Sequence, residues 1–183
     1  MLPALSRPMK YLPFLAVFCS INFSSAVAPG LPALGAPSVK LTSLSTTASL
    51  LQQLNSYRRQ AGLPPLVLSE TACRAARLQA EYNLTHRTHG HYHPLYPTPR
   101  QRLAAVGHQF EKASGYVSYG FENCVRFRGM RATNLRNIET QILRAYQQSP
   151  KHNAALLDRN PTKVGIATVY DGDELQNSIV FCI

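Results

Sequence analysis

Four of the six histidines in this 183-residue chain lie within eight residues, namely His86, His89, His91 and His93. An extended backbone over residues 90–93 would turn the last three of them to one face, because side chains alternate along a strand. Three imidazoles on one face could bind Zn²⁺ at about 2.0–2.1 Å each. The chain lacks the His-Glu-x-x-His helix of metalloproteases. A metal site, a cleft without metal and a solvated histidine-rich loop are therefore the alternatives.

Helical periodicity predicts several of the elements that must position these side chains. Apolar residues at three- and four-residue steps predict helices over residues 47–61 and 134–149. Ser69 can cap a helix that runs to residue 84, and its many alanines indicate close packing against another layer. Thr98-Pro99 opens a short helix that ends near residue 107.

A β-hairpin is predicted at the C-terminal end. Residues 164–170 are rich in β-branched side chains, Asp171-Gly172 is a turn signal, and residues 178–182 form the returning strand. Helices followed by a terminal hairpin predict a layered α+β fold and argue against a βαβ nucleotide-binding sheet.

The charge balance is strongly basic without a basic tail. The formal net charge is +10 although only 15% of residues are charged, so the bias comes from scarce acids. No run of five or more basic residues occurs, and we expect no nucleic-acid partner. Arginines at positions 126, 128, 131 and 136 indicate a solvated face or a weak contact with an anionic surface polymer.

Residues 1–28 have the pattern of a secretory signal peptide. Arg7 and Lys10 precede the apolar run YLPFLAVFC, and Ala26-Val27-Ala28 offers a cleavage site. The run is too short to be a comfortable membrane span of about 20 residues, although an uncleaved anchor is the alternative. Residues 29–43 read as a Pro/Gly/Ala linker, and residues 44–183 as the domain. We expect a secreted, periplasmic or cell-envelope protein.

Three cysteines remain after cleavage, at positions 73, 124 and 182. In an oxidising compartment, one disulfide and one thiol are expected, and three pairings are possible. A Cys124–Cys182 disulfide, the candidate pairing, would stabilise the fold by about 4 kcal/mol in the chain-entropy model. Three buried free cysteines are the alternative. Asn83-Leu84-Thr85 also matches an N-glycosylation acceptor.

Three segments, read together, resemble the CAP superfamily of cysteine-rich secretory, venom antigen and pathogenesis-related proteins, with its bacterial SCP-domain relatives. They are LLQQLNSYRRQAGLPPLVLSETACRAARLQAEY (50–82), GFENC (120–124) and YQQSPKHNAALLDRNPTKVGIA (146–167). The resemblance implies a three-layer α-β-α sandwich with a small antiparallel sheet. It also implies a cleft lined by histidines and acids, which in some relatives binds a divalent metal.

The resemblance carries over to particular positions. Glu122 matches the glutamate of the Gly-Glu-Asn motif, and His152 matches the histidine of the Ser-Pro-x-His segment. The remaining histidine belongs twelve residues before the leucine of an Arg-Leu pair, which from Leu103 gives His91, with His89 as the runner-up. His91, His152 and Glu122 are thus candidate ligands of a divalent metal such as zinc, or the lining of a cleft without metal.

The chain departs from the family pattern at three positions. Phe121 stands in place of glycine, Tyr146 in place of tryptophan, and Ser149 where eukaryotic members have a second acid. The cleft therefore keeps one acid.

This incomplete acid set favours a secreted binding module for a lipid, sterol or cell-envelope ligand over an enzyme. The alternative is a hydrolase, with or without metal, in which Glu122 is the general base and His91 and His152 are ligands or acid. Cys124 beside His152 is a less favoured nucleophile than a buried or disulfide-bonded cysteine.

Overall fold

The computed structural model describes residues 40–41, 44–110 and 121–183, all within the second of two compact units, Gly35–Ile183. The predicted signal peptide and almost all of the predicted linker lie outside the described residues. Within the described ranges, no helix combines the length and the apolar character that crossing a membrane requires.

An antiparallel hairpin forms the centre of the sheet, as the sequence predicts. Its strands are β4 (Lys163–Tyr170) and β5 (Leu175–Cys182), and β5 begins three residues earlier than predicted. The strand order is β1-β4-β5-β3, where β3 (Phe121–Phe127) pairs with β5, and β1 (Lys40–Leu41) pairs with β4. The short β2 (Val67–Leu68) pairs with β4 in parallel.

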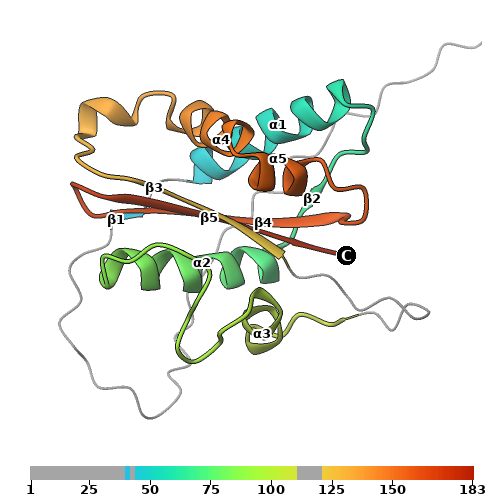
Figure 1. Cartoon of the computed structure of the whole chain (residues 1–183), viewed down its shortest axis with the longest axis horizontal. Helices are drawn as coiled ribbons and strands as arrows, with labels where there is room; N and C mark the ends of the chain where they lie inside the picture. Colours follow the sequence, from blue (N-terminus) through green and yellow to red (C-terminus); the bar gives the residue numbers. More distant parts are fainter. Residues whose placement is uncertain (1–39, 42–43, 111–120) are drawn as a thin grey trace, which may run out of the picture. The chain divides into compact units, whose positions relative to one another are not determined.

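Helices cover both faces of the sheet (Figure 1). One face carries α1 (Leu44–Gln60), α4 (Ile138–Gln148) and α5 (Pro150–Leu156). The other face carries α2 (Glu70–Thr85) and α3 (Pro99–Ala105). The three layers confirm the predicted α-β-α sandwich of the α+β class.

The region of the predicted fourth helix differs from the prediction. A 3₁₀ turn over Ala132–Leu135 comes first, and α4 starts only at Ile138, because Asn137 has a left-handed φ of 56° that an α-helix cannot include. The predicted end at Ser149 is right for α4. Pro150 then opens α5, which was not predicted, and proline is favoured at the first position of a helix.

Phe121, Glu122 and Asn123 of the Gly-Phe-Glu-Asn segment are the first three residues of strand β3. The strand pairs with β5 over its whole length, from Phe121 opposite Phe181 to Phe127 opposite Leu175. The Phe121 ring stacks on the Phe181 ring with centroids 4.8 Å apart. The large side chain that replaces the family's glycine is therefore accommodated by cross-strand packing.

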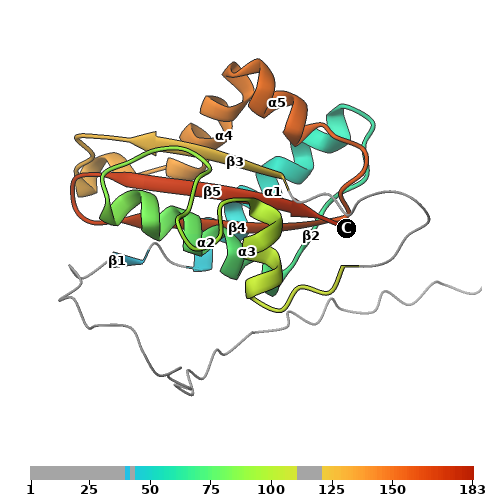
Figure 2. The same cartoon turned by 60° about the horizontal axis from the view of Figure 1, so that its bottom comes forward.

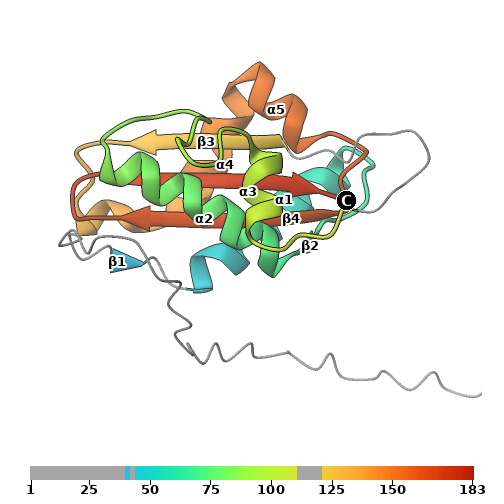
Figure 3. The same cartoon turned by 90° about the horizontal axis from the view of Figure 1, so that it is seen from below.

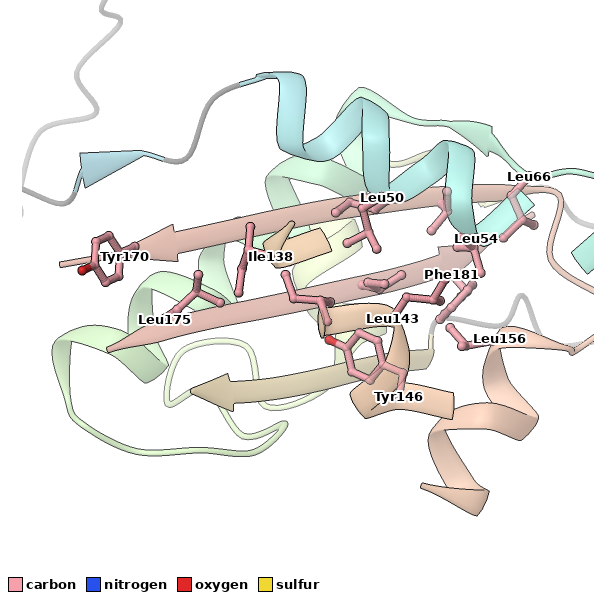
Figure 4. Close-up of a cluster of buried hydrophobic side chains, with 14 of the residues drawn as sticks. Leu50, Leu54, Leu66, Ile138, Leu143, Tyr146, Leu156, Tyr170, Leu175 and Phe181 are labelled. Carbon is pink, nitrogen blue, oxygen red and sulfur yellow. The ribbon is translucent and has the colours of Figure 1, made fainter. Parts of the chain in front are cut away.

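The core between the sheet and α1, α4 and α5 is apolar and closely packed (Figure 4). Leu50 and Leu54 of α1 meet Ile142 of α4 and Phe181 of β5, all with 0% exposure. Tyr146 is buried in the same core, and its hydroxyl donates to Asn177 Oδ1 at 2.7 Å. Tyr146 therefore stands at the family's tryptophan position as a fully buried aromatic residue.

The alanine-rich α2 packs directly on β4 and β5. A Cβ added at Gly165 would lie 1.9 Å from the backbone carbon of Ala72, so only glycine allows the helix to approach the strand this closely. The Ser69 side chain accepts from the Ala72 amide and caps α2, as predicted. Because α2 lies over β4 and β5, the same face of β3 is left to the segment between α2 and α3 (Figures 2 and 3).

Candidate functional site

Alternation along β3 places Glu122, Cys124 and Arg126 on one face of the sheet. They stand opposite Val180, Ser178 and Gln176 of β5. Val180 packs in the alanine-rich cluster beneath α2, so this polar row lies on the α2 side of the sheet. Residues 86–98, here called the histidine loop, cross this row between α2 and α3 (Figure 3).

Two buried amides of α2 hold the start of the histidine loop. Gln79 Nε2 donates to the carbonyls of Gly90 and Tyr92, both at 3.0 Å, and Asn83 Nδ2 donates to Gly90 O at 3.0 Å. Gly90 has a φ of +141°, a conformation that favours glycine. The loop is therefore bent and anchored rather than extended.

The anchoring role of Asn83 bears on the glycosylation acceptor. Asn83 is 1% exposed, and its amide nitrogen is engaged with the loop. A glycan on this nitrogen is incompatible with the folded domain.

The extended backbone that would place the three histidines on one face is therefore not formed, and His93 is buried whereas His89 and His91 are exposed. His93 points inward, with its ring 4.9 Å from that of Tyr82 and 5.5 Å from that of Tyr96. His89 lies near Arg126 and His91. Partial desolvation, and then these two groups, lower the pKa of His89.

Glu122 is the centre of the polar row, and its side chain is fully buried. Arg102 donates to Glu122 Oε2 at 2.7 Å, and His91 Nδ1 lies 3.1 Å from the same oxygen. Ser178 Oγ donates to Oε1 at 2.8 Å, and the Cys124 thiol is a further hydrogen-bond partner. A carboxylate has about four lone-pair sites, so these partners use its whole acceptor capacity. Because an ionised carboxylate only accepts, His91 Nδ1 carries the hydrogen.

Arg102 is the site residue that sequence reasoning missed. Its side chain is fully buried, and besides Glu122 it donates to the carbonyls of His91 at 3.2 Å and Tyr96 at 3.0 Å. It therefore neutralises the buried carboxylate and fastens the histidine loop at once. Nothing local distinguishes this arginine from the solvent-facing arginines of the chain, and its neighbour Leu103 served only to count to His91.

His152 of α5 lies beside β3 without joining the Glu122 contacts. Its ring meets the Tyr146 ring edge-on at 5.5 Å, and its carbonyl accepts from Asn123 Nδ2 at 3.0 Å. Burial, followed by the charges of His91 and His89, lowers the pKa of His152. The structure thus brings His91 into contact with Glu122, with His152 and His89 close enough to influence one another electrostatically.

Among the described residues, one group of side chains has metal-compatible spacing: possible ligand atoms of His91, Glu122 and Cys124 lie within 4.8 Å of one another. Glu122 and the thiol are already engaged with protein partners, however, and burial and the Glu122 carboxylate raise the pKa of Cys124 well above its ordinary value. The His91 ring, 49% exposed as a side chain, keeps Nε2 for another partner while Glu122 orients it. Metal-binding histidines commonly have such a carboxylate behind them. Within this group, the His91 imidazole is therefore the side chain with a nitrogen left for a metal, and Glu122 lies behind it.

The predicted Cys124–Cys182 disulfide is wrong. All three described cysteines are free. Cys124 is opposite Ser178, and Cys182 lies four residues further along β5, about 13 Å at roughly 3.3 Å per residue. A disulfide needs Cα atoms within about 7 Å. The buried Cys124, with its raised pKa, is also a poor nucleophile.

With this fold and site in view, the sequence matches the model of the CAP family, described as the cysteine-rich secretory protein family, over residues 51–183. The chain belongs to this family. None of the curated protein sequences compared with it matches.

Solved structures show the same fold at low sequence identity. An outer surface protein of Borrelia burgdorferi superposes with a TM-score of 0.61 at 17% identity, covering 78% of this chain and 95% of that one. An extracellular SCP-domain protein of Bacillus anthracis gives 0.58 at 18%, covering 74% and 40%. A cysteine-rich secretory protein of Staphylococcus aureus gives 0.52 at 15%, covering 75% and 38%. The chain thus spans less than half of the last two proteins.

Proposed function

We propose that this CAP-domain protein is an exported, non-catalytic binding module for a lipid, sterol or other cell-envelope component. The observation that carries the proposal is the state of Glu122, whose buried carboxylate already has Arg102, His91, Ser178 and Cys124 as partners. The acid on which a hydrolase would depend is part of the internal framework of the site.

A general base must reach the proton that it abstracts, directly or through one water. The Glu122 side chain is 0% exposed, so neither water nor substrate approaches it without rearrangement of the histidine loop. No second acid compensates, because Ser149 stands at the corresponding family position. These features favour binding over hydrolysis.

Export is supported by two independent observations. Residues 1–28 have the signal-peptide pattern, and the Borrelia and Bacillus proteins that share the fold are described as outer surface and extracellular proteins. The basic charge excess favours retention on an anionic envelope, an attraction that salt weakens.

The binding proposal is tested on protein purified from an exporting host. Organic extraction followed by mass spectrometry is expected to release a co-purified apolar or amphiphilic component. Ester and peptide substrates are expected to show no turnover above buffer. Turnover that disappears in Glu122→Gln, in a variant whose circular dichroism spectrum at the assay temperature shows that it is folded, would instead establish the hydrolase.

A divalent metal such as zinc is a second proposal for the same site, supported by the exposed Nε2 of His91 and the closeness of His89 and His152. Bound there, the metal would supply a Lewis-acidic contact for an anionic ligand group. Zinc titration by calorimetry is expected to lose its signal in His91→Ala and to keep it in His86→Ala, since His86 lies at the end of α2 and bonds to Tyr82. Equal loss in both variants would contradict this assignment.

A further inference from the structure

The histidine loop ends in an exposed apolar tip. Among the described residues, four large hydrophobic side chains are prominently exposed, and two of them, Tyr92 at 62% and Leu95 at 66%, lie on this loop. Pro94 and Pro97, beside Leu95, are exposed as well. Single exposed apolar residues are ordinary on protein surfaces. Four exposed apolar residues within six positions of one loop form a local apolar patch, and such patches mark interaction sites.

The tip is held outward by the same bonds that build the site. Gln79 fixes the Tyr92 carbonyl, and Arg102 fixes the Tyr96 carbonyl on the other side of Leu95. Between them, His93 is 8% exposed and accepts from the backbone amides of Leu95 and Tyr96 through Nδ1. The loop therefore does not need to be ordered when a partner binds, which lowers the entropic cost of binding.

The charge around the tip suits an anionic partner. No acidic residue occurs between Glu81 and Glu111, a stretch that contains three arginines and five histidines. Arg87 and Arg102 are paired with acids elsewhere in the domain. Arg100, on the first turn of α3 directly after the loop, is exposed, and its guanidinium lies over the Phe110 ring at 4.6 Å from the ring centroid. The loop itself therefore adds no negative charge that would repel an anionic surface.

The size of the tip distinguishes between possible partners. A specific protein–protein interface buries about 1,200–2,000 Å² in total, which two large side chains and two prolines cannot supply. A lipid surface needs no matching shape. Tyrosine, with an apolar ring and a polar hydroxyl, suits the headgroup level, and leucine suits the acyl boundary beneath it.

We propose that the tip of the histidine loop is a membrane-docking element, in which Tyr92 and Leu95 enter the headgroup–acyl boundary of a bilayer containing anionic lipid. This inference rests on the proposed function and gives its envelope component a definite form, a lipid surface. Docking through the tip places His91, on the same loop, beside the lipid headgroups.

The test is flotation of the full chain with vesicles of phosphatidylcholine, alone or mixed with phosphatidylglycerol. The parent protein is expected to float with the mixed vesicles, less so at high salt. Tyr92→Ser combined with Leu95→Ser is expected to lower the partition coefficient by about tenfold. The matched control is Val67→Ser, because Val67 is 65% exposed but lies on β2, which pairs with β4 at the edge of the sheet away from β3. This control is expected to bind like the parent.

The docking element would be contradicted if the parent protein does not float with the mixed vesicles or if the double variant floats as well as the parent. It would also be contradicted if Val67→Ser loses as much vesicle binding as the double variant. A change of oligomeric state in the double variant, seen by sedimentation, would assign the tip to a second copy of the chain instead. Because both replaced side chains are exposed, an unchanged thermal melt confirms that the variant is folded. A ligand that still co-purifies with the double variant would show that the binding function is kept when docking is lost. The binding function itself would be contradicted by hydrolytic turnover.

Discussion

Replacing Arg102 by leucine should destabilise the domain more than any change on its surface. The substitution leaves the fully buried Glu122 carboxylate without its cation, and it removes the donors to the carbonyls of His91 and Tyr96. Stranding one partner of a buried ion pair costs about 3–5 kcal/mol, and each lost hydrogen bond adds about 1 kcal/mol. The free energy of unfolding of an ordinary domain is about 5–15 kcal/mol in total. Arg102→Leu should therefore remove much of the stability of this domain.

Thermal unfolding followed by circular dichroism measures the effect. At about 2–4 °C per kcal/mol for a domain of this size, the combined loss of about 5–7 kcal/mol lowers Tm by roughly 10–28 °C. Amide hydrogen exchange should also accelerate between Gly90 and Tyr96, because the loop loses the donors that Arg102 supplies.

A double-mutant cycle separates the ion pair from the loss of packing. Glu122→Leu alone strands the buried arginine, whereas the double variant Arg102→Leu with Glu122→Leu strands neither charge. We expect the double variant to be more stable than the sum of the single losses predicts, by about 2 kcal/mol or more. Additivity within about 0.5 kcal/mol, or an Arg102→Leu variant that melts with the parent, would refute the reasoning.

Three further changes test other parts of the fold. Gly165→Ala should lower the free energy of unfolding by about 2 kcal/mol or more, because its Cβ would lie 1.9 Å from the Ala72 carbonyl carbon. This loss is measured as a lower urea midpoint with an unchanged m-value, and a midpoint equal to that of the parent would contradict the close approach of α2. Burial alone would raise the pKa of Asp171, but the backbone amides of its own turn and the Arg87 guanidinium hold it below its ordinary value. Its stabilising contribution is therefore present above about pH 4 and lost as pH falls through the folded-state pKa, so the stability gap between the parent and Asp171→Asn should narrow in acid; a constant gap would contradict the pairing. Burial, followed by the charge of a nearby lysine, lowers the pKa of His108. As pH falls below about 6.5, the unfolded chain therefore takes up a proton before the folded one, and the domain loses stability. In denaturant titrations, His108→Gln should lose less stability than the parent over that range, and equal losses would refute this.

Local chemistry was sufficient to predict the elements whose ends and faces depend on residues adjacent in the sequence. Ser69 caps α2, and Asp171-Gly172 turns the terminal hairpin, because caps and turns depend on a few adjacent backbone groups. The same local reasoning missed α5, because Pro150 ends one helix and begins the next. It also predicted no strand over residues 121–127, since β3 exists through its pairing with β5, which is distant in the chain.

The candidate site shows where sequence reasoning ends. His91 and Glu122 were chosen by resemblance, and the structure brings His91 Nδ1 within 3.1 Å of Glu122 Oε2. The cysteine pairing failed, because the register of β3 on β5 sets the distance between Cys124 and Cys182, and register depends on strands far apart in the chain.

The sequence by itself determined the helix caps, the hairpin turn and the supply of imidazoles and one acid near the middle of the chain. Only the tertiary structure decided what that acid does. Glu122 on β3, Arg102 on α3 and Ser178 on β5 meet because the sheet and its covering layer fold together. Burial then makes a satisfied ion pair the stable arrangement and an unpaired charge costly, which no local pattern can reveal.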